Sequence, residues 1–212
     1  MSMSATIYLL RHGETTWNRA GRLQGHLDAP LTRLGLAQVD AAGRTLASLL
    51  NGSGFRLVAS PLGRTRQSAA VVAEHLGVDY DAILWDERLK EITLGDWDGY
   101  PGWGALDRDF PHEAERRNAD PWNYRYPNGE SSQDVQDRVR PFLDECHATG
   151  GVHVVVAHGV VNKVMRGLYL GLTREQTFAL DRPQDAFHRL EAGTEARIDV
   201  EVAASAQAEW AL

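Results

Sequence analysis

The chain has 212 residues, enough for one large domain or two small ones, and its 43% hydrophobic and 24% charged residues are ordinary for a globular protein. Its formal net charge of −7 argues against nucleic acid or an anionic membrane as a partner, although a local basic pocket is compatible with it. The single cysteine, Cys146, excludes an intrachain disulfide and fits a reducing compartment, so we expect a cytoplasmic protein.

Neither a membrane span nor a secretory signal is expected from the apolar segments. The longest apolar runs, near the N-terminus and in "VHVVVA", are far too short to cross a bilayer. The opening residues, "MSMSATIYLL", lack a basic region and a small-residue cleavage site.

The first part of the chain alternates between β-rich apolar runs and helical patterns. Residues 5–10, "ATIYLL", predict a short strand that stops abruptly at an arginine, a histidine and a glycine. Residues 31–50 place apolar side chains at helical spacing, and residues 55–60, "FRLVAS", predict the next strand.

A helix over residues 60–77 is predicted with clear ends. We expect Ser60 to be its N-cap, Pro61 to take the first helical position, and Gly77 to follow its last turn.

The second half continues the alternation. Residues 131–148 have a helical pattern, although we expect Pro141 to break or kink this helix. Residues 152–157 predict an apolar strand, and residues 159–171 a helix that is closed by a glycine. Two more strands are expected at "DAFHRLE" (185–191) and "ARIDVEVA" (196–203).

This alternation predicts an α/β fold with a mainly parallel sheet and helices on both faces. In such sheets, ligands bind outside the carboxyl ends of the strands. Arg11 and His12 follow the first predicted strand, Arg64 lies just after the second, and His158 and Gly159 follow "VHVVVA". Any one of these residues alone would be an ordinary loop or surface residue. Together, two arginines and two histidines at one rim predict a site for phosphate or another oxyanion.

Five segments carry a resemblance to a known family. "LLRHGETTWN", "SPLGRTRQSA", "LKEITLGDWDG", "NGES" and "VVAHG" occur in this order over residues 7–159. The chain thereby resembles the histidine phosphatase superfamily, the clan of the cofactor-dependent phosphoglycerate mutases. The resemblance implies a single domain over residues 1–212, a three-layer sandwich with a mixed central sheet.

The resemblance also implies the roles of individual residues. His12 would be the nucleophile, and Glu91 would be the general acid. The phosphoryl oxygens would be held by Arg11, Arg64 and His158, with help from Asn18 and the Gly159 amide. Glu14 is expected to point away from the site. The other histidines match no family motif and are expected to be structural or solvent-facing (His26, His75, His112, His147, His153 and His188).

General chemistry agrees with this assignment. Phosphoryl transfer depends mainly on positioning and on neutralising the charge of the transferred group, which two arginines and a second histidine can do. A neutral imidazole is a competent nucleophile, and a carboxyl group can protonate the leaving oxygen. We therefore expect no metal ion and no cofactor.

Two reactions, and one role without catalysis, are compatible with such a site. The segments "LGDWDG" and "NGES", and the short stretch between Glu91 and Glu130, favour a phosphomonoester phosphatase over a 2,3-bisphosphoglycerate-dependent mutase. The alternative without catalysis is a phosphoprotein-binding regulator, which would be expected to lack the nucleophile or the acid. This sequence has both His12 and Glu91, which argues against that alternative. We expect a small phosphomonoester as the partner, and the sequence leaves the oligomeric state open, with a homodimer among the alternatives.

Residues 100–128 are the least predictable part of the chain. They are rich in aromatic residues, and we expect them to be a cap over the site. Their aromatic side chains could line a pocket for an apolar leaving group or form a small core of their own. Their four arginines are offset by five acidic residues, which does not favour a cage for a second phosphate.

Overall fold

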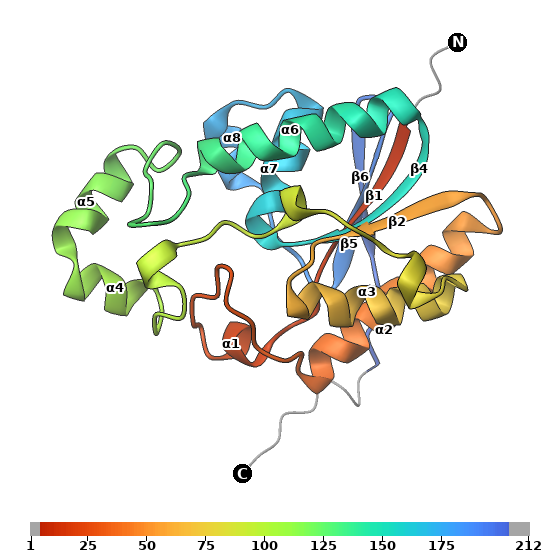
Figure 1. Ribbon diagram of the computed structural model, residues 1–212, viewed down its shortest axis with the longest axis horizontal. Coiled ribbons are helices and arrows are strands. Elements are labelled where there is room, and N and C mark those ends of the chain that lie inside the picture. The colour runs from red at the N-terminus through yellow and green to blue at the C-terminus, as the bar shows by residue number, and fades with distance from the viewer. Residues whose placement is uncertain (1–4, 204–212) are drawn as a thin grey trace.

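A six-stranded mixed sheet with helices on both faces dominates the computed structural model, which describes residues 5–203 (Figure 1). The strands are β1 (Ala5–Arg11), β2 (Phe55–Ala59), β3 (Leu84–Trp85), β4 (Gly151–Ala157), β5 (Ala186–Glu191) and β6 (Thr194–Asp199). The helices are α1 (Thr16–Arg19), α2 (Arg33–Leu50), α3 (Gly63–Leu76), α4 (Trp103–Asp109), α5 (Pro111–Ala119), α6 (Ser132–Thr149), α7 (Gly159–Leu170) and α8 (Arg174–Ala179). Short 3₁₀ turns occupy Tyr80–Ala82, Glu87–Leu89 and Gly95–Trp97.

The strand order is β3-β2-β4-β1-β5-β6. The first four strands in this order run parallel, while β5 is antiparallel to β1 and β6 is antiparallel to β5. This arrangement confirms the predicted α/β fold with a mainly parallel, mixed central sheet.

The side chains of β1 alternate between the two faces of the sheet, as the geometry of a strand requires. Ile7 and Leu9 belong to a core that includes residues of α6 and α7. Tyr8 and Leu10 belong to a second core, which α2 and α3 cover. The central strand is therefore buried on both faces, which explains why its sequence reads as a continuous apolar run.

The carboxyl ends of the three central parallel strands meet at one edge of the sheet. Arg11 pairs in register with Ala157, and Ala59 pairs with Val156. The first residues beyond β1 and β2 continue this pairing, because the His12 amide donates to the Ala157 carbonyl and the Ser60 amide donates to the Val156 carbonyl. The residues that follow β1, β2 and β4 are thus brought together, as the sequence predicts.

One local prediction about α3 is wrong, and the break predicted as one alternative in α6 does not occur. The N-cap of α3 is Leu62 rather than Ser60, and no side chain caps this helix; Pro61 accordingly lies before the helix. Helix α6 is not broken at Pro141 but runs to Thr149. Proline has no N–H group, so Pro141 cannot donate the helical hydrogen bond to the carbonyl of Asp137. Both residues are exposed, so this carbonyl is not buried without a partner.

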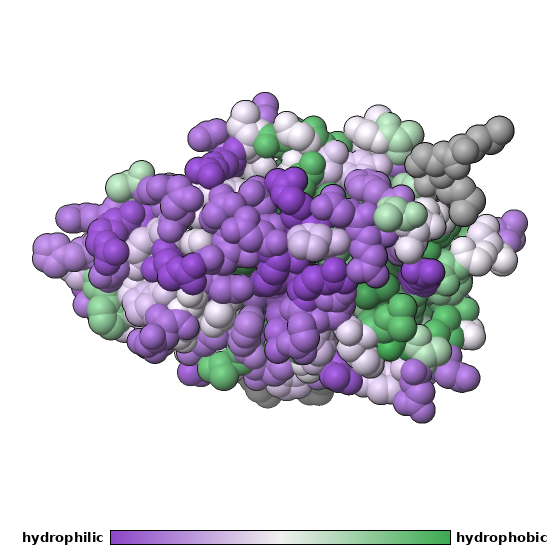
Figure 2. All heavy atoms as spheres, turned by 45° about the horizontal axis from the view of Figure 1, so that its top comes forward, coloured by the Kyte–Doolittle hydropathy of each residue, from purple (hydrophilic) through white to green (hydrophobic). Residues whose placement is uncertain are grey.

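Residues 100–128 contain α4 and α5 and extend the molecule to the side of the sheet (Figure 1). Their aromatic residues divide between the two expected roles: Tyr124 is buried against Trp97, whereas Trp103 and Tyr126 line a cavity. In the view of Figure 2, hydrophilic residues cover most of the surface, and hydrophobic ones gather toward the β3 edge, where Leu84 is 52% exposed. Within residues 5–203, no helix combines the length and the hydropathy that crossing a bilayer requires.

Candidate active site

The loop after β1 is fixed against the start of α2. A Cβ atom at Gly13 would lie 2.2 Å from the Gly35 carbonyl oxygen, and a Cβ atom at Gly35 would lie 2.0 Å from the Glu14 carbonyl oxygen. Both positions therefore require glycine for close backbone contact. The Gly13 amide also donates to the Ser68 hydroxyl at 3.2 Å, so His12 is carried on a loop that is held from two sides.

His12 is buried and oriented by its own neighbour. Its Nδ1 atom lies 2.8 Å from the Gly13 carbonyl oxygen, which can only accept a hydrogen bond, so the proton is assigned to Nδ1 and the lone pair to Nε2. Burial lowers the pKa of His12 well below its usual value, and the charges of Arg11 and Arg64 lower it further. The imidazole is thus held neutral, with a free nitrogen lone pair.

The two arginines are held rigidly beside this histidine. Arg64 is 1% exposed and donates to the Leu27 carbonyl at 2.9 Å, to the Gly25 carbonyl at 2.8 Å and to the Asp28 carboxylate at 3.0 Å. Arg11 donates to the Arg182 carbonyl at 2.7 Å. Burial lowers the pKa of both arginines, that of Arg11 to about 10, which still leaves both protonated at neutral pH.

His158, the N-cap residue of α7, is fully buried beside His12. The two ring centroids are 5.2 Å apart. The Nε2 atom of His158 lies 2.7 Å from the Ser60 hydroxyl, so Ser60 contacts this histidine instead of capping α3. Burial lowers the pKa of His158 well below its usual value, and nearby Arg64 adds to the effect.

Glu91 binds the first turn of α7. Its carboxylate accepts hydrogen bonds from the amides of Val160 at 3.2 Å, Val161 at 3.4 Å and Ile92 at 3.0 Å. The contact ties Glu91 to the helix that begins directly after His158.

The backbone of Glu91 is also held in place. Its carbonyl oxygen accepts from Arg138 at 3.1 Å and from the ring of His26 at 2.7 Å. Arg138 is in turn paired with Glu130 at 2.8 Å, which gives the "NGES" segment a structural role. His26, which we expected to be structural or solvent-facing, thus holds the backbone of the proposed acid.

Most of the predicted site residues line one cavity of about 150 Å³. Of these it includes Arg11, His12, Asn18, Arg64 and Glu91. His158 is not among the lining residues of this cavity but lies against His12, which is, and Gly159 lies in a smaller neighbouring cavity together with Arg11. Glu14 points away as expected, since its carboxylate binds Arg19 at 2.9 Å and Thr32 at 2.6 Å.

Several residues of this cavity were missed by the sequence analysis, among them Gln24, Gly25, Arg22 and Arg182. The Gln24 carbonyl accepts from Thr15 at 3.0 Å and from Asn18 at 3.2 Å, which leaves its amide nitrogen available. Three of these residues lie in the segment "GRLQGHLDAPLT", whose glutamine and glycine could have pointed to the site. In the structure, the glutamine is buried and the glycine after it has a φ of +50°.

Four buried nitrogen atoms around His12 have no hydrogen-bond partner within residues 5–203: Arg11 Nε, Gln24 Nε2, Arg64 Nε and His158 Nδ1. Buried polar atoms are normally paired, and an unpaired group in a protein calls for a ligand or another explanation. Two of them belong to guanidinium groups, which favour an anion with several oxygen atoms. In the part of the chain that the structure describes, no three His, Cys, Asp or Glu side chains cluster as metal ligands would.

Comparisons with known proteins agree with this geometry. The family model of the histidine phosphatase superfamily (branch 1) matches residues 7–200. A probable phosphoglycerate mutase GpmB of Yersinia pestis (strain Pestoides F) is 33% identical over 172 residues, which are 78% of this chain and 75% of the relative. The chain belongs to the histidine phosphatase superfamily.

Solved structures show the same fold. A mycobacterial glucosyl-3-phosphoglycerate phosphatase, solved with VO3, superposes with a TM-score of 0.75 at 28% identity, covering 94% of this chain and 99% of that one. YhfR of Bacillus stearothermophilus superposes with a TM-score of 0.72 at 28% identity, covering 95% and 98% of the two chains. The family and the phosphatases among its solved structures make this chain a phosphatase-type enzyme.

Proposed function

We propose that this member of the histidine phosphatase superfamily is a phosphomonoester phosphatase that works through a phosphohistidine on His12. The four unpaired nitrogen atoms around His12 carry the proposal, because each can donate a hydrogen bond to an oxygen of a phosphoryl group, His158 Nδ1 doing so when the Ser60 hydroxyl donates to Nε2. Arg11 and Arg64 neutralise the transferred group, and Asn18, His158 and the Gly159 amide complete its binding site.

The proposed reaction has two displacements. First, Nε2 of His12 attacks phosphorus, the N–P bond forms, the P–O ester bond breaks, and Glu91 gives its proton to the leaving oxygen. In the second step water attacks the phosphorus, Glu91 takes a proton from that water, and the N–P bond breaks. Inorganic phosphate leaves, and both His12 and Glu91 return to their starting states.

We favour hydrolysis over mutase chemistry because the arginines of the proposed cap are already paired. Arg116 binds Glu113 at 2.9 Å, Arg117 binds Asp107 at 2.9 Å, and Arg108 and Arg125 bind neighbouring aspartates. A second phosphate on a bisphosphoglycerate would have to compete with these carboxylates. The name of the Yersinia relative keeps mutase activity as the second candidate.

Trapping the phosphoenzyme tests the proposal directly. Brief exposure to labelled phosphomonoester should label the protein, and the label should survive alkali and be lost in acid, as expected for a phosphoramidate. His12→Ala should not be labelled, whereas His112→Ala, which removes a histidine whose side chain is 95% exposed, should be labelled normally. An acid-stable label, or one that persists in His12→Ala, would contradict the mechanism.

Two further expectations belong to this proposal. We propose that the chain is one domain in which residues 100–128 cap the site, and that its activity needs no metal ion. Full turnover of p-nitrophenyl phosphate should therefore survive treatment with a chelator. Loss of activity that a divalent ion restores would point to a different class of phosphatase. A product that retains the phosphate, formed only with bisphosphoglycerate present, would favour the mutase.

A further inference from the structure

The cavity of about 150 Å³ that is lined by His12, Arg11 and Arg64 is called the phosphoryl cavity below. A second cavity, of about 330 Å³, adjoins it. The two share Ile92, Leu94, Trp103, Val160 and Arg182 as lining residues. A phosphomonoester that places its phosphoryl group beside His12 therefore directs its alcohol portion into this second cavity. We call it the leaving-group cavity.

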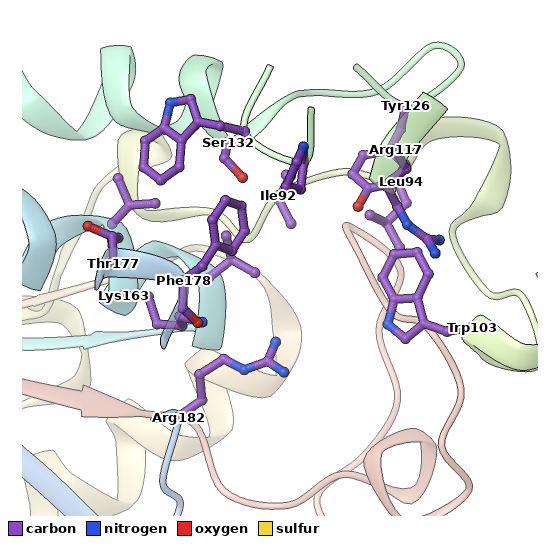
Figure 3. Close-up of a pocket in the computed structure, with 14 residues that line it drawn as sticks. Ile92, Leu94, Trp103, Arg117, Tyr126, Ser132, Lys163, Thr177, Phe178 and Arg182 are labelled. Atoms are coloured by element: carbon purple, nitrogen blue, oxygen red, sulfur yellow. The ribbon is translucent and has the colours of Figure 1, made fainter. Parts of the chain in front are cut away.

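Most of the leaving-group cavity is apolar. Its walls include the aromatic residues Trp103, Trp122, Tyr126 and Phe178, together with aliphatic residues such as Ile92 and Val164. Figure 3 shows Phe178 on one side of the cavity and Trp103 and Tyr126 on the other. Such walls favour a ligand with an apolar body large enough to touch both sides.

The charged groups of the leaving-group cavity all have one sign. Arg117, Lys163 and Arg182 line it, and no carboxylate among residues 5–203 does, although the chain as a whole has a net charge of −7. Arg117 is paired with Asp107 and lies over the Trp103 ring. Lys163 donates to the Phe178 carbonyl, and burial lowers its pKa to about 8.

Arg182 is different from these two cations. It lies in the loop before β5, and its guanidinium points into the cavity (Figure 3). Within residues 5–203, no carboxylate pairs with it, and its positive charge contributes to lowering the pKa of Arg11 and of Lys163. An arginine held among cations at the mouth of an apolar cavity is suited to bind an anion.

We propose that the enzyme prefers phosphomonoesters whose alcohol combines a bulky apolar body with a carboxylate that pairs with Arg182. The inference rests on the proposed phosphatase function and names its substrate class. The phosphoryl group binds beside His12, the apolar body lies between Phe178 and Trp103, and the carboxylate meets the guanidinium of Arg182.

The competing explanation is that Arg182 serves the transferred phosphoryl group itself, because it also lines the phosphoryl cavity. The two roles differ in what they predict. A phosphoryl-binding arginine would matter equally for every substrate and for inhibition by inorganic phosphate. A carboxylate-binding arginine would matter mainly for substrates that carry the second anion.

The test uses a matched pair of aryl phosphates, one with a propionate arm and one with the neutral propionamide arm, and p-nitrophenyl phosphate as the reference. We expect kcat/KM for the propionate to exceed that for the propionamide by about tenfold in the unmodified enzyme, the size typical of one charged hydrogen bond. In Arg182→Gln the preference should fall below about threefold. Arg140→Gln, which removes an exposed arginine on α6 outside the cavities described above, should keep it.

The possible results of this comparison of substrates distinguish between the two proposals. An unmodified enzyme that hydrolyses p-nitrophenyl phosphate but does not distinguish the pair overturns the inference and leaves the phosphatase proposal standing. Equal losses on all three substrates in Arg182→Gln, with weaker inhibition by inorganic phosphate, overturn it in favour of a phosphoryl-binding role. No turnover of any phosphomonoester by the unmodified enzyme would overturn both proposals.

Discussion

The phosphoryl cavity and the leaving-group cavity are neighbours built in different ways. Around His12, the side chains come from the ends of central strands, are almost fully buried, and are held by backbone carbonyls. Around Trp103, they come from the helices α4 to α8 and the loops, and both Trp103 and Phe178 are about 40% exposed. The first region is polar and held by many hydrogen bonds, and the second is mostly apolar.

This difference separates two tasks within one enzyme. A phosphoryl group has the same shape in every phosphomonoester, so a preorganised binding site can serve all of them. The leaving group varies, and loops positioned by a rigid scaffold can vary with it. Substitutions in the first region should therefore change the rate on every substrate, and those in the second should change which substrates are used.

Glu91 lies at the boundary, and its substitution should have the largest effect on one class of substrate. Glu91→Gln cannot protonate the leaving oxygen, so the rate on an alkyl phosphate should fall on the order of 10²–10⁴-fold. The burst rate on p-nitrophenyl phosphate should fall much less, because nitrophenolate leaves without a proton. Glu87→Gln, in the adjacent exposed turn, is the control. Equal burst losses on both substrates would leave Glu91 only a positioning role.

Arg64→Lys tests whether a change in the phosphoryl cavity lowers the rate equally for substrates with different leaving groups. Lysine keeps the charge but loses the forked geometry, so we expect a loss on the order of 10²-fold, the same for aryl and alkyl phosphates. Inhibition by inorganic phosphate should weaken in parallel. Arg66→Lys, two residues along α3 with contacts to Pro61 and Tyr80, should be close to neutral. A loss confined to one leaving group would break the proposed division of tasks.

Trp103→Ala, unlike Arg64→Lys, should affect some substrates much more than others. Removing this wall of the leaving-group cavity should raise KM for bulky aryl phosphates by about tenfold, since part of an aromatic contact is lost. Inhibition by inorganic phosphate should change little, because the groups proposed to hold phosphate surround His12, although Trp103 also lines the phosphoryl cavity. Leu84→Ala, at the far edge of the sheet, provides a control of comparable exposure. Weaker phosphate inhibition in Trp103→Ala would show that the two cavities are not independent.

The smallest expected effect concerns stability rather than catalysis. Burial lowers the pKa of His153, on β4 outside both cavities, below its usual 6.5. As the pH falls through 6.5, the unfolded chain takes up a proton that the folded one does not, so stability decreases. His153→Gln should lose less Tm between pH 7 and pH 5 than the parent, by about 1–3 °C. The remaining slope comes from other histidines with lowered pKa values, and an unchanged slope would exclude a contribution from His153.

The phosphoryl cavity was largely predictable because its residues follow strands. A strand such as residues 5–10 can be recognised from its apolar run. In a parallel sheet, the residues that follow such strands lie at the same edge. Arg11, His12, Arg64 and His158 could therefore be grouped before their geometry was known. Glu91 could not, because it lies in an irregular segment between short turns, and only the resemblance identified it.

The leaving-group cavity was not predictable in the same way. Arg182 and Phe178 come from a loop and a short helix that have no periodic signal, and they meet Trp103 only through tertiary packing. Local rules also failed where a tertiary contact competed with them. Ser60 is a good capping residue by type, yet its hydroxyl is used by His158. Pro141 breaks helices in general, but here the affected side of α6 is exposed.

The hydrogen bond between His12 Nδ1 and the Gly13 carbonyl would also fix the regiochemistry of the proposed covalent intermediate. Imidazole can carry a phosphoryl group on either nitrogen, and the two adducts are different chemical species with different lifetimes. Because the carbonyl occupies Nδ1, only the adduct on Nε2 can form in this site. A single backbone oxygen would thus select one isomer of the proposed phosphohistidine before any substrate arrives.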